Sequence, residues 1–202
     1  MEVISITEQP KQRVKICLDN GTDFLLYKKE AARFHLEEGS DLSESAYELI
    51  LTEILKPRCR KRALHLLEKQ DRSRKNLSAK LKEGGYSDFL IEDALTYIDR
   101  FGYIDEDRMA RSHIRFYQSS RSKSRIKQDL IGKGIPLDII EICIEEEYQE
   151  SELDQIKRLL EKKGYDASSA DMNMKNKMYR FLMGRGFSSS EIRRALDEYE
   201  EF

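Results

Sequence analysis

The chain has 202 residues, of which 39% are hydrophobic and 37% are charged, and its formal net charge is −2. This supply of apolar residues excludes a disordered chain, and the charge excludes an overall basic field of the kind that attracts nucleic acid. No apolar run approaches the ~20 residues of a membrane span, and no leader-like segment precedes the rest, so we expect a cytoplasmic protein without membrane contact. Cys17, Cys59 and Cys143 lie far apart without metal-ligand spacing, which predicts free thiols and no cofactor.

The N-terminal segment predicts a β-hairpin. Residues 14–18 alternate apolar and polar side chains, and residues 22–27 form a second extended stretch. Between them, Asp19-Asn20-Gly21 is typical of a tight turn, because Asn and Gly tolerate positive φ. Residues 3–7 are short and β-branched, and they leave open a third strand.

Two helices are predicted after the hairpin. The first covers residues 28–36, and the second begins at an N-cap at Ser43 and runs to about Leu55. Pro57 is expected to break this second helix. Five of the seven residues at 56–62 are basic, and we interpret this run as the junction between a small N-terminal module and the rest.

A repeat follows, with offsets of 49 and 52 residues between its three copies. In each copy an apolar residue precedes a leucine by four positions, a glycine follows that leucine by four, and a bulky apolar residue comes next. The matched positions are Leu77, Leu81, Gly85 and Tyr86; Ile126, Leu130, Gly134 and Ile135; and Met178, Leu182, Gly186 and Phe187.

The repeat predicts a helix that ends at a left-handed glycine, followed by a second helix that begins at Ser87, at Pro136, or at Ser188 with Glu191 as a capping box. A leading helix precedes each pair, over about residues 60–69, 106–118 and 152–163. The predicted fold class is therefore mainly α, a tandem array of three three-helix units preceded by a small module of β-hairpin and helices. The expected domains are residues 1–56 for that module and 57–105, 106–150 and 151–202 for the helical repeats.

Charge is segregated along the chain. Residues 108–133 contain eight Lys or Arg and one acid, Asp129, whereas residues 137–154 contain eight acids and no base. Local fields of this kind can steer a partner, although a charge run is more often a solvated face.

The candidate binding residues are basic side chains at equivalent places in the repeat. Those entering the middle helix of each copy are Arg72, Arg74, Lys75, Arg121, Lys123, Arg125, Lys175 and Lys177, and weaker candidates on a leading helix are Arg111 and Arg115. Long cations at repeating positions suit a partner with periodic phosphates or carboxylates. The alternative, that they cap helices or pair with local Glu, stays open for each residue.

Other patterns favour structural roles. Residues 105–107 are acidic, which is better explained by a helix N-terminus than by a metal site. Tyr97, Tyr103, Phe116 and Tyr117 alternate with bases as in a stacking surface, but their helical spacing favours core packing. The sequence shows no pattern that combines a nucleophile with a general base and a group to orient it, so we expect a protein that is not an enzyme.

Several segments together resemble the RecX regulatory family. They are residues 72–77 (RSRKNL), residues 102–110 (GYIDEDRMA) and residues 125–135, with Arg125-Ile126, Leu130 and Lys133-Gly134-Ile135. The sequence departs from the family pattern at Asn76, usually Glu, at Glu106, usually Asp, and at Met109, usually Phe. The resemblance covers about residues 56–202 and is firmest between residues 72 and 147.

The resemblance implies a regulator of the RecA recombinase in DNA repair and the SOS response. Such a protein is three tandem three-helix units that bind along the groove of the RecA–DNA filament, bridge its protomers, and hinder ATP hydrolysis and strand exchange. We expect a monomer with RecA as its partner. The alternative from the residues themselves is a direct binder of single- or double-stranded DNA, since three-helix units with a basic entry resemble helix-turn-helix modules.

Overall fold

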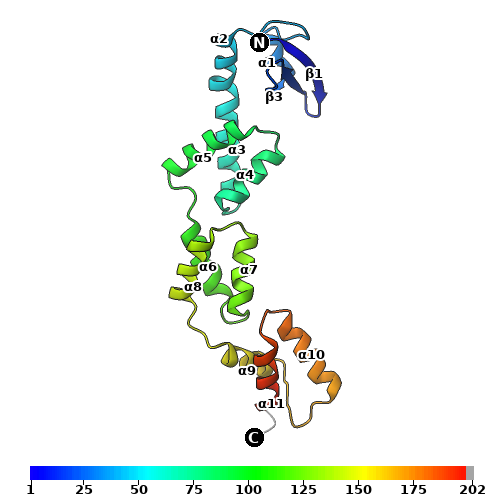
Figure 1. The fold of residues 1–202 in the computed structure, drawn as a ribbon, viewed down its shortest axis with the longest axis vertical. Helices are drawn as coiled ribbons and strands as arrows, with labels where there is room; N and C mark the ends of the chain where they lie inside the picture. The colour runs from blue at the N-terminus through cyan, green and yellow to red at the C-terminus, as the bar shows by residue number, and fades with distance from the viewer. Residues whose placement is uncertain (199–202) are drawn as a thin grey trace. The chain divides into compact units, whose positions relative to one another are not determined.

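The computed structural model describes residues 1–198, and their side chains through Leu196. It confirms the predicted fold class: a small antiparallel sheet is followed by helices that recur in groups of three (Figure 1). The chain forms two compact units, Met1–Ile104 and a second unit that begins at Asp105.

The N-terminal sheet has three strands in the order β1-β2-β3, all antiparallel: β1 (Val3–Gln9), β2 (Arg13–Leu18) and β3 (Asp23–Tyr27). The third strand that the sequence left open is therefore present. Alternate residues of β2 are buried, which places Ile16 against the core and its neighbours toward solvent. Gly21 makes the turn with φ +79°.

The first helix is shorter than predicted. α1 (Lys28–Arg33) ends before residue 36, because the chain reverses at His35, whose φ is +50°. The next helix, α2 (Glu44–Leu49), begins as expected at Ser43, whose Oγ accepts a hydrogen bond from the Ala46 N–H at 3.2 Å.

The expected helix break at Pro57 is wrong. The helix continues from α2 through a π-helical segment, η1 (Ile50–Leu55), into α3 (Lys56–Lys69). Pro57 lies in the first turn of α3, where proline is tolerated.

The remaining helices extend the groups of three. The first triplet is α3, α4 (Arg74–Glu83) and α5 (Asp88–Arg100); the second is α6 (Glu106–Tyr117), α7 (Lys123–Gly132) and α8 (Leu137–Glu147); the third is α9 (Glu152–Lys162), α10 (Met172–Met183) and α11 (Ser189–Glu198). The division of the chain into four domains at the predicted boundaries stays a prediction.

The middle helix of each triplet ends as the repeat predicts. Each repeat glycine has φ between +81° and +85°, and the backbone N–H of the next residue donates to the carbonyl of the leucine four residues before the glycine. These bonds join Tyr86 to Leu81 (3.3 Å), Ile135 to Leu130 (3.2 Å) and Phe187 to Leu182 (3.4 Å). One start differs from prediction, because Pro136 is the cap before α8 and not its first residue.

The hydrophobic cores also differ between the two units. In the first unit one core joins the sheet to the first triplet, from Val3 to Ile98, whereas the second and third triplets each have their own core. All three cysteines are free, with Cys59 and Cys143 buried and Cys17 half-buried. Among the described residues, no group of His, Cys, Asp and Glu side chains could hold a metal ion. None of the described helices is long and apolar enough to span a membrane.

Candidate functional site

The middle helices α4, α7 and α10 share an unusual electrostatic feature at their starts. None of the three has an acidic residue in its first turn, whereas α5, α6, α8 and α9 all do. Acidic side chains there would stabilise a helix, because its N-terminus has a partial positive charge. In α4 and α7 lysine and arginine add to that charge, whereas the start of α10 is capped by the acid Asp171.

At the start of α4, the two arginines bond within the first unit. Arg72 donates to the Asn76 Oδ1 at 2.7 Å and to the Leu66 carbonyl at 3.4 Å. Arg74 pairs with Glu92 at 2.8 Å and also with Asp99. Lys75 is exposed. Of the predicted candidates in this group, Lys75 is thus the one best placed to reach a partner.

At the start of α7, Asp129 collects the arginines. It pairs with Arg121 and, at 3.2 Å, with the Arg125 Nε, while the Arg121 guanidinium also lies 3.8 Å from the centre of the Tyr117 ring. Lys123 is exposed. Asp129, the one acid of residues 108–133, therefore neutralises part of the positive charge that the sequence places at the start of α7.

Arg111 and Arg115 join α6 to α8. Arg111 pairs with Asp107 (2.7 Å) and Glu146 (2.7 Å), and both arginines donate to Glu147. The hydrogen bond from Arg115, aided by that from Arg111, lowers the pKa of Glu147 to about 2. The basic and acidic segments thus meet across the second triplet, which is the local pairing that the sequence left open.

In α10, Lys175 is half-buried and Lys177 is exposed. The helix begins at Asp171, whose Oδ1 accepts from the Met174 N–H at 2.7 Å. The exposed lysines Lys75, Lys123 and Lys177 hence stand in or near the first turns of equivalent helices, and we call them the lysine set.

The expected core packing of the aromatic residues is wrong for two of the four. Phe116 is 74% exposed and Tyr103 is 51% exposed, whereas Tyr97 and Tyr117 are half-buried. Phe116 packs edge-on against Tyr117 at 4.7 Å between ring centres. Helical spacing alone does not distinguish an inward face from an aromatic residue that packs on its neighbour at the surface.

The sequence reasoning also missed a half-buried acid where the second and third triplets meet. The Glu152 Oε1 accepts the Lys123 backbone N–H at 2.8 Å, across the start of α7. Burial raises the pKa of Glu152 to about 7, and the nearby Glu191 carboxyl of α11 adds to the rise. Two acids without a common cation, separated by some 40 residues, give no local signal in a sequence.

Glu152 is expected to make the stability of the second unit depend on pH. Because its folded pKa of about 7 lies above its ordinary value of 4.5, the folded state holds the extra proton between these values, and this stabilisation is lost as pH rises through about 7. We expect Glu152→Gln to remove this dependence and to stabilise the protein by about 1 kcal/mol at pH 8, after discounting for solvent screening, and negligibly at pH 5. Urea unfolding at both pH values measures the difference, and an equal effect at both would contradict the assignment.

Two stretches of the chain match one protein family. Residues 59–97 match the first three-helix domain of RecX, and residues 150–196 match the third three-helix domain of RecX.

Whole-chain comparisons give the same family. Regulatory protein RecX of Clostridium acetobutylicum is 26% identical over 200 residues, covering 96% of this chain and 94% of the relative. Regulatory protein RecX of Clostridioides difficile is 25% identical and covers 100% of this chain and 98% of the relative. A crystal structure of regulatory protein RecX matches with a TM-score of 0.60 at 25% identity, covering 97% of this chain and 98% of that one. RecX from Lactobacillus salivarius, 23% identical, shares the fold with a TM-score of 0.60 over 73% of this chain and 98% of that chain.

Proposed function

The chain belongs to the RecX family of regulatory proteins, and from this premise we propose that it binds the RecA–DNA filament and restrains its ATPase and strand-exchange activities. The protein acts in this proposal by binding alone, in the cytoplasm where RecA filaments form, and without a reaction of its own. Its four domains are the N-terminal module and the three helical repeats.

The observation that supports the proposal best is the lysine set. Lys75, Lys123 and Lys177 are exposed on the middle helices of the three triplets, Lys75 and Lys123 in the first turn and Lys177 in the second turn of a helix that is capped by Asp171. A filament repeats the same phosphates and acidic side chains at every protomer. A protein built from repeats can meet a periodic partner with a cation from each unit.

The arginines have a second role in this proposal. Most of them are held by acids within the chain, including Arg74, Arg111 and Arg121. Pairing holds their side chains in place and offsets part of their charge. The lysines then supply the screened, salt-sensitive attraction to the filament.

The test is the single-stranded-DNA-dependent ATPase rate of RecA as this protein is added at less than one copy per RecA. We expect strong inhibition at such ratios, because a filament-directed regulator need not cover the DNA. Absence of inhibition together with tight, steeply salt-dependent binding to naked DNA would support the DNA-binding alternative instead.

A charge-reversal variant tests the lysine set itself. We expect K75E/K123E/K177E to need at least tenfold more protein for half-inhibition, because each change puts an acid where the filament meets a cation. The matched control is K11E/K29E/K69E, which makes the same change in net charge at three exposed lysines outside the set. Equal loss in both variants would mean that total charge matters and the lysine set does not.

A further inference from the structure

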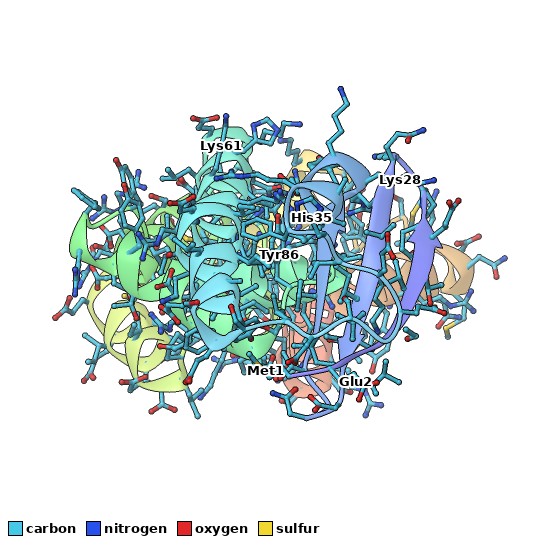
Figure 2. All side chains as sticks on the ribbon, turned by 90° about the horizontal axis from the view of Figure 1, so that it is seen from above. Met1, Glu2, Lys28, His35, Lys61 and Tyr86 are labelled. Atoms are coloured by element: carbon cyan, nitrogen blue, oxygen red, sulfur yellow. The ribbon has the colours of Figure 1, made fainter. Side chains whose placement is uncertain are left out.

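The first unit contains a cavity of about 440 Å³ between the N-terminal sheet and the first triplet. Its walls are β3, one face of α3 and the turn between α4 and α5. Figure 2 shows Tyr86, from that turn, between the strands and the helix that contains Lys61. We call it the sheet–helix cavity. It involves none of the ten predicted binding residues.

The walls of the cavity are fixed to one another. A Cβ added at Gly85 would lie 2.7 Å from the Leu25 Cδ1, so the end of α4 packs tightly on β3. Arg58 of α3 donates to the Leu25 carbonyl at 3.2 Å and pairs with Glu30 of α1. Sheet and triplet also share one hydrophobic core, so the cavity is a preformed part of the fold.

Cations dominate the opening. Four Lys or Arg side chains line the cavity against two carboxylates, and the cations are Arg13, Arg58, Lys61 and Arg62. Lys61 and Arg62 are exposed neighbours on α3, one turn before His65 on the same face.

The two acids of the cavity are already engaged. The Asp23 carboxylate pairs with Lys15 at 2.5 Å, and Glu68 lies 3.5 Å from the His65 Nδ1. Neither acid forms an ion pair with Lys61 or Arg62 in the described part of the chain, and the four cations outnumber the two acids. Arg58 and Arg62 both oppose the rise that burial causes in the pKa of Tyr86, as cations close to its hydroxyl do.

The interior of the cavity is apolar and aromatic. Phe24, Leu55, Leu64 and Leu90 lie beneath the charged rim, and Tyr27 and Tyr86 supply ring surfaces. Cavities of a few hundred Å³ with an apolar floor and a few convergent polar groups are typical of small-molecule sites. An acidic peptide would place a chain of charges across a surface, whereas this site has room for one flat body and one multiply charged group.

We propose that the sheet–helix cavity binds a nucleoside 5′-phosphate, either free or as the 5′ end of a strand, with the phosphate at Lys61 and Arg62 and the base against the tyrosines. Arginine and lysine together suit a phosphate, because one gives a forked pair of donors and the other a point charge. The proposal gives the N-terminal module a function as one wall of a ligand site. It does not depend on binding to RecA.

The probe is AMP, titrated into the full-length protein without RecA or DNA and followed by calorimetry. We expect saturable binding that weakens at least tenfold in the variant K61A/R62A, and at least tenfold when adenosine replaces AMP. The matched control is K69A, which removes an exposed lysine from the same helix outside the cavity. Thermal unfolding of each variant verifies that the fold is kept.

A second titration separates the two sources of the ligand. A tetranucleotide with a 5′-phosphate is compared with the same tetranucleotide bearing a 5′-hydroxyl. Tighter binding of the phosphorylated strand, lost in K61A/R62A, would identify a strand end, and binding of AMP alone would identify a free nucleotide. No saturable binding of either probe, or binding unchanged in K61A/R62A, would overturn the proposal, as would displacement of AMP by an acidic peptide that binds more tightly.

Discussion

Replacing Gly186 with alanine is expected to destabilise the second unit by about 2–4 kcal/mol. The φ of Gly186 is +84°, which a residue with a Cβ adopts at a cost of about 1 kcal/mol or more. The new Cβ would also lie 2.6 Å from the Arg125 Cβ and 2.8 Å from the Ser122 Oγ. Because the Arg125 Cα is only 3.3 Å away, the backbone of α7 must shift and not merely a flexible side chain.

The shift would also break the link between the second and third triplets. The Ser122 Oγ donates to the Gly186 carbonyl at 2.6 Å, and the Ser122 N–H donates to the Arg185 carbonyl at 3.1 Å. Ser122 is fully buried, so losing these partners leaves polar groups unsatisfied. We therefore expect faster amide hydrogen exchange at the start of α7 as well as a lower urea midpoint.

Gly164→Ala is the matched control for Gly186→Ala. Gly164 is in the same unit with φ +65°, but an added Cβ would meet no atom within 4 Å. Its substitution isolates the backbone strain, and we expect about 1 kcal/mol of destabilisation. If Gly164→Ala and Gly186→Ala lowered the free energy of unfolding equally, the close contact of residue 186 with α7 would contribute nothing to stability.

Two repeat glycines have the same local role but different neighbours. Gly85 and Gly186 both end a middle helix in the left-handed conformation, yet Gly85 packs on the sheet whereas Gly186 packs on α7. Glycine spacing predicted the conformation because a helix C-cap is decided within a few residues. It could not predict the neighbour, which depends on how segments far apart in sequence meet.

The same distinction explains which parts of the candidate site were predictable. The positions of the basic residues at helix starts followed from caps and spacing. Their pairing did not, because Arg115 and Glu147 are 32 residues apart and meet only when α6 packs on α8. The basic run at 56–62 has the sequence pattern of a junction, because a proline usually breaks a helix. With the helix continuous through Pro57, Arg58, Lys61 and Arg62 of this run line one wall of a cavity.

Arg58 of α3 bonds to the sheet, and Arg58→Ala is expected to destabilise the first unit by about 2–3 kcal/mol. Its guanidinium bonds to the Leu25 carbonyl, pairs with Glu30 and lies 4.9 Å from the centre of the Tyr27 ring. Both partners of the ion pair are about three-quarters buried, at 24% and 26% exposure, so removing the cation leaves a poorly solvated carboxylate. The Glu30 Oε2 also accepts the Tyr27 N–H at 2.8 Å, which couples the loss to the end of β3.

Two further variants distinguish the contacts of Arg58 from its charge. Arg58→Lys keeps the charge, but an ammonium cannot bond to a carbonyl and a carboxylate while lying flat on a ring. We therefore expect Arg58→Lys to recover less than half of the unfolding free energy that Arg58→Ala loses. Arg62→Ala removes an exposed arginine one turn along the same helix and should change stability by less than about 0.5 kcal/mol. Urea unfolding gives the free energies, and hydrogen exchange at β3 shows whether the loss is local to the sheet. If Arg58→Lys were as stable as the parent protein, charge alone would hold the sheet on α3, and the carbonyl and ring contacts would be incidental to it.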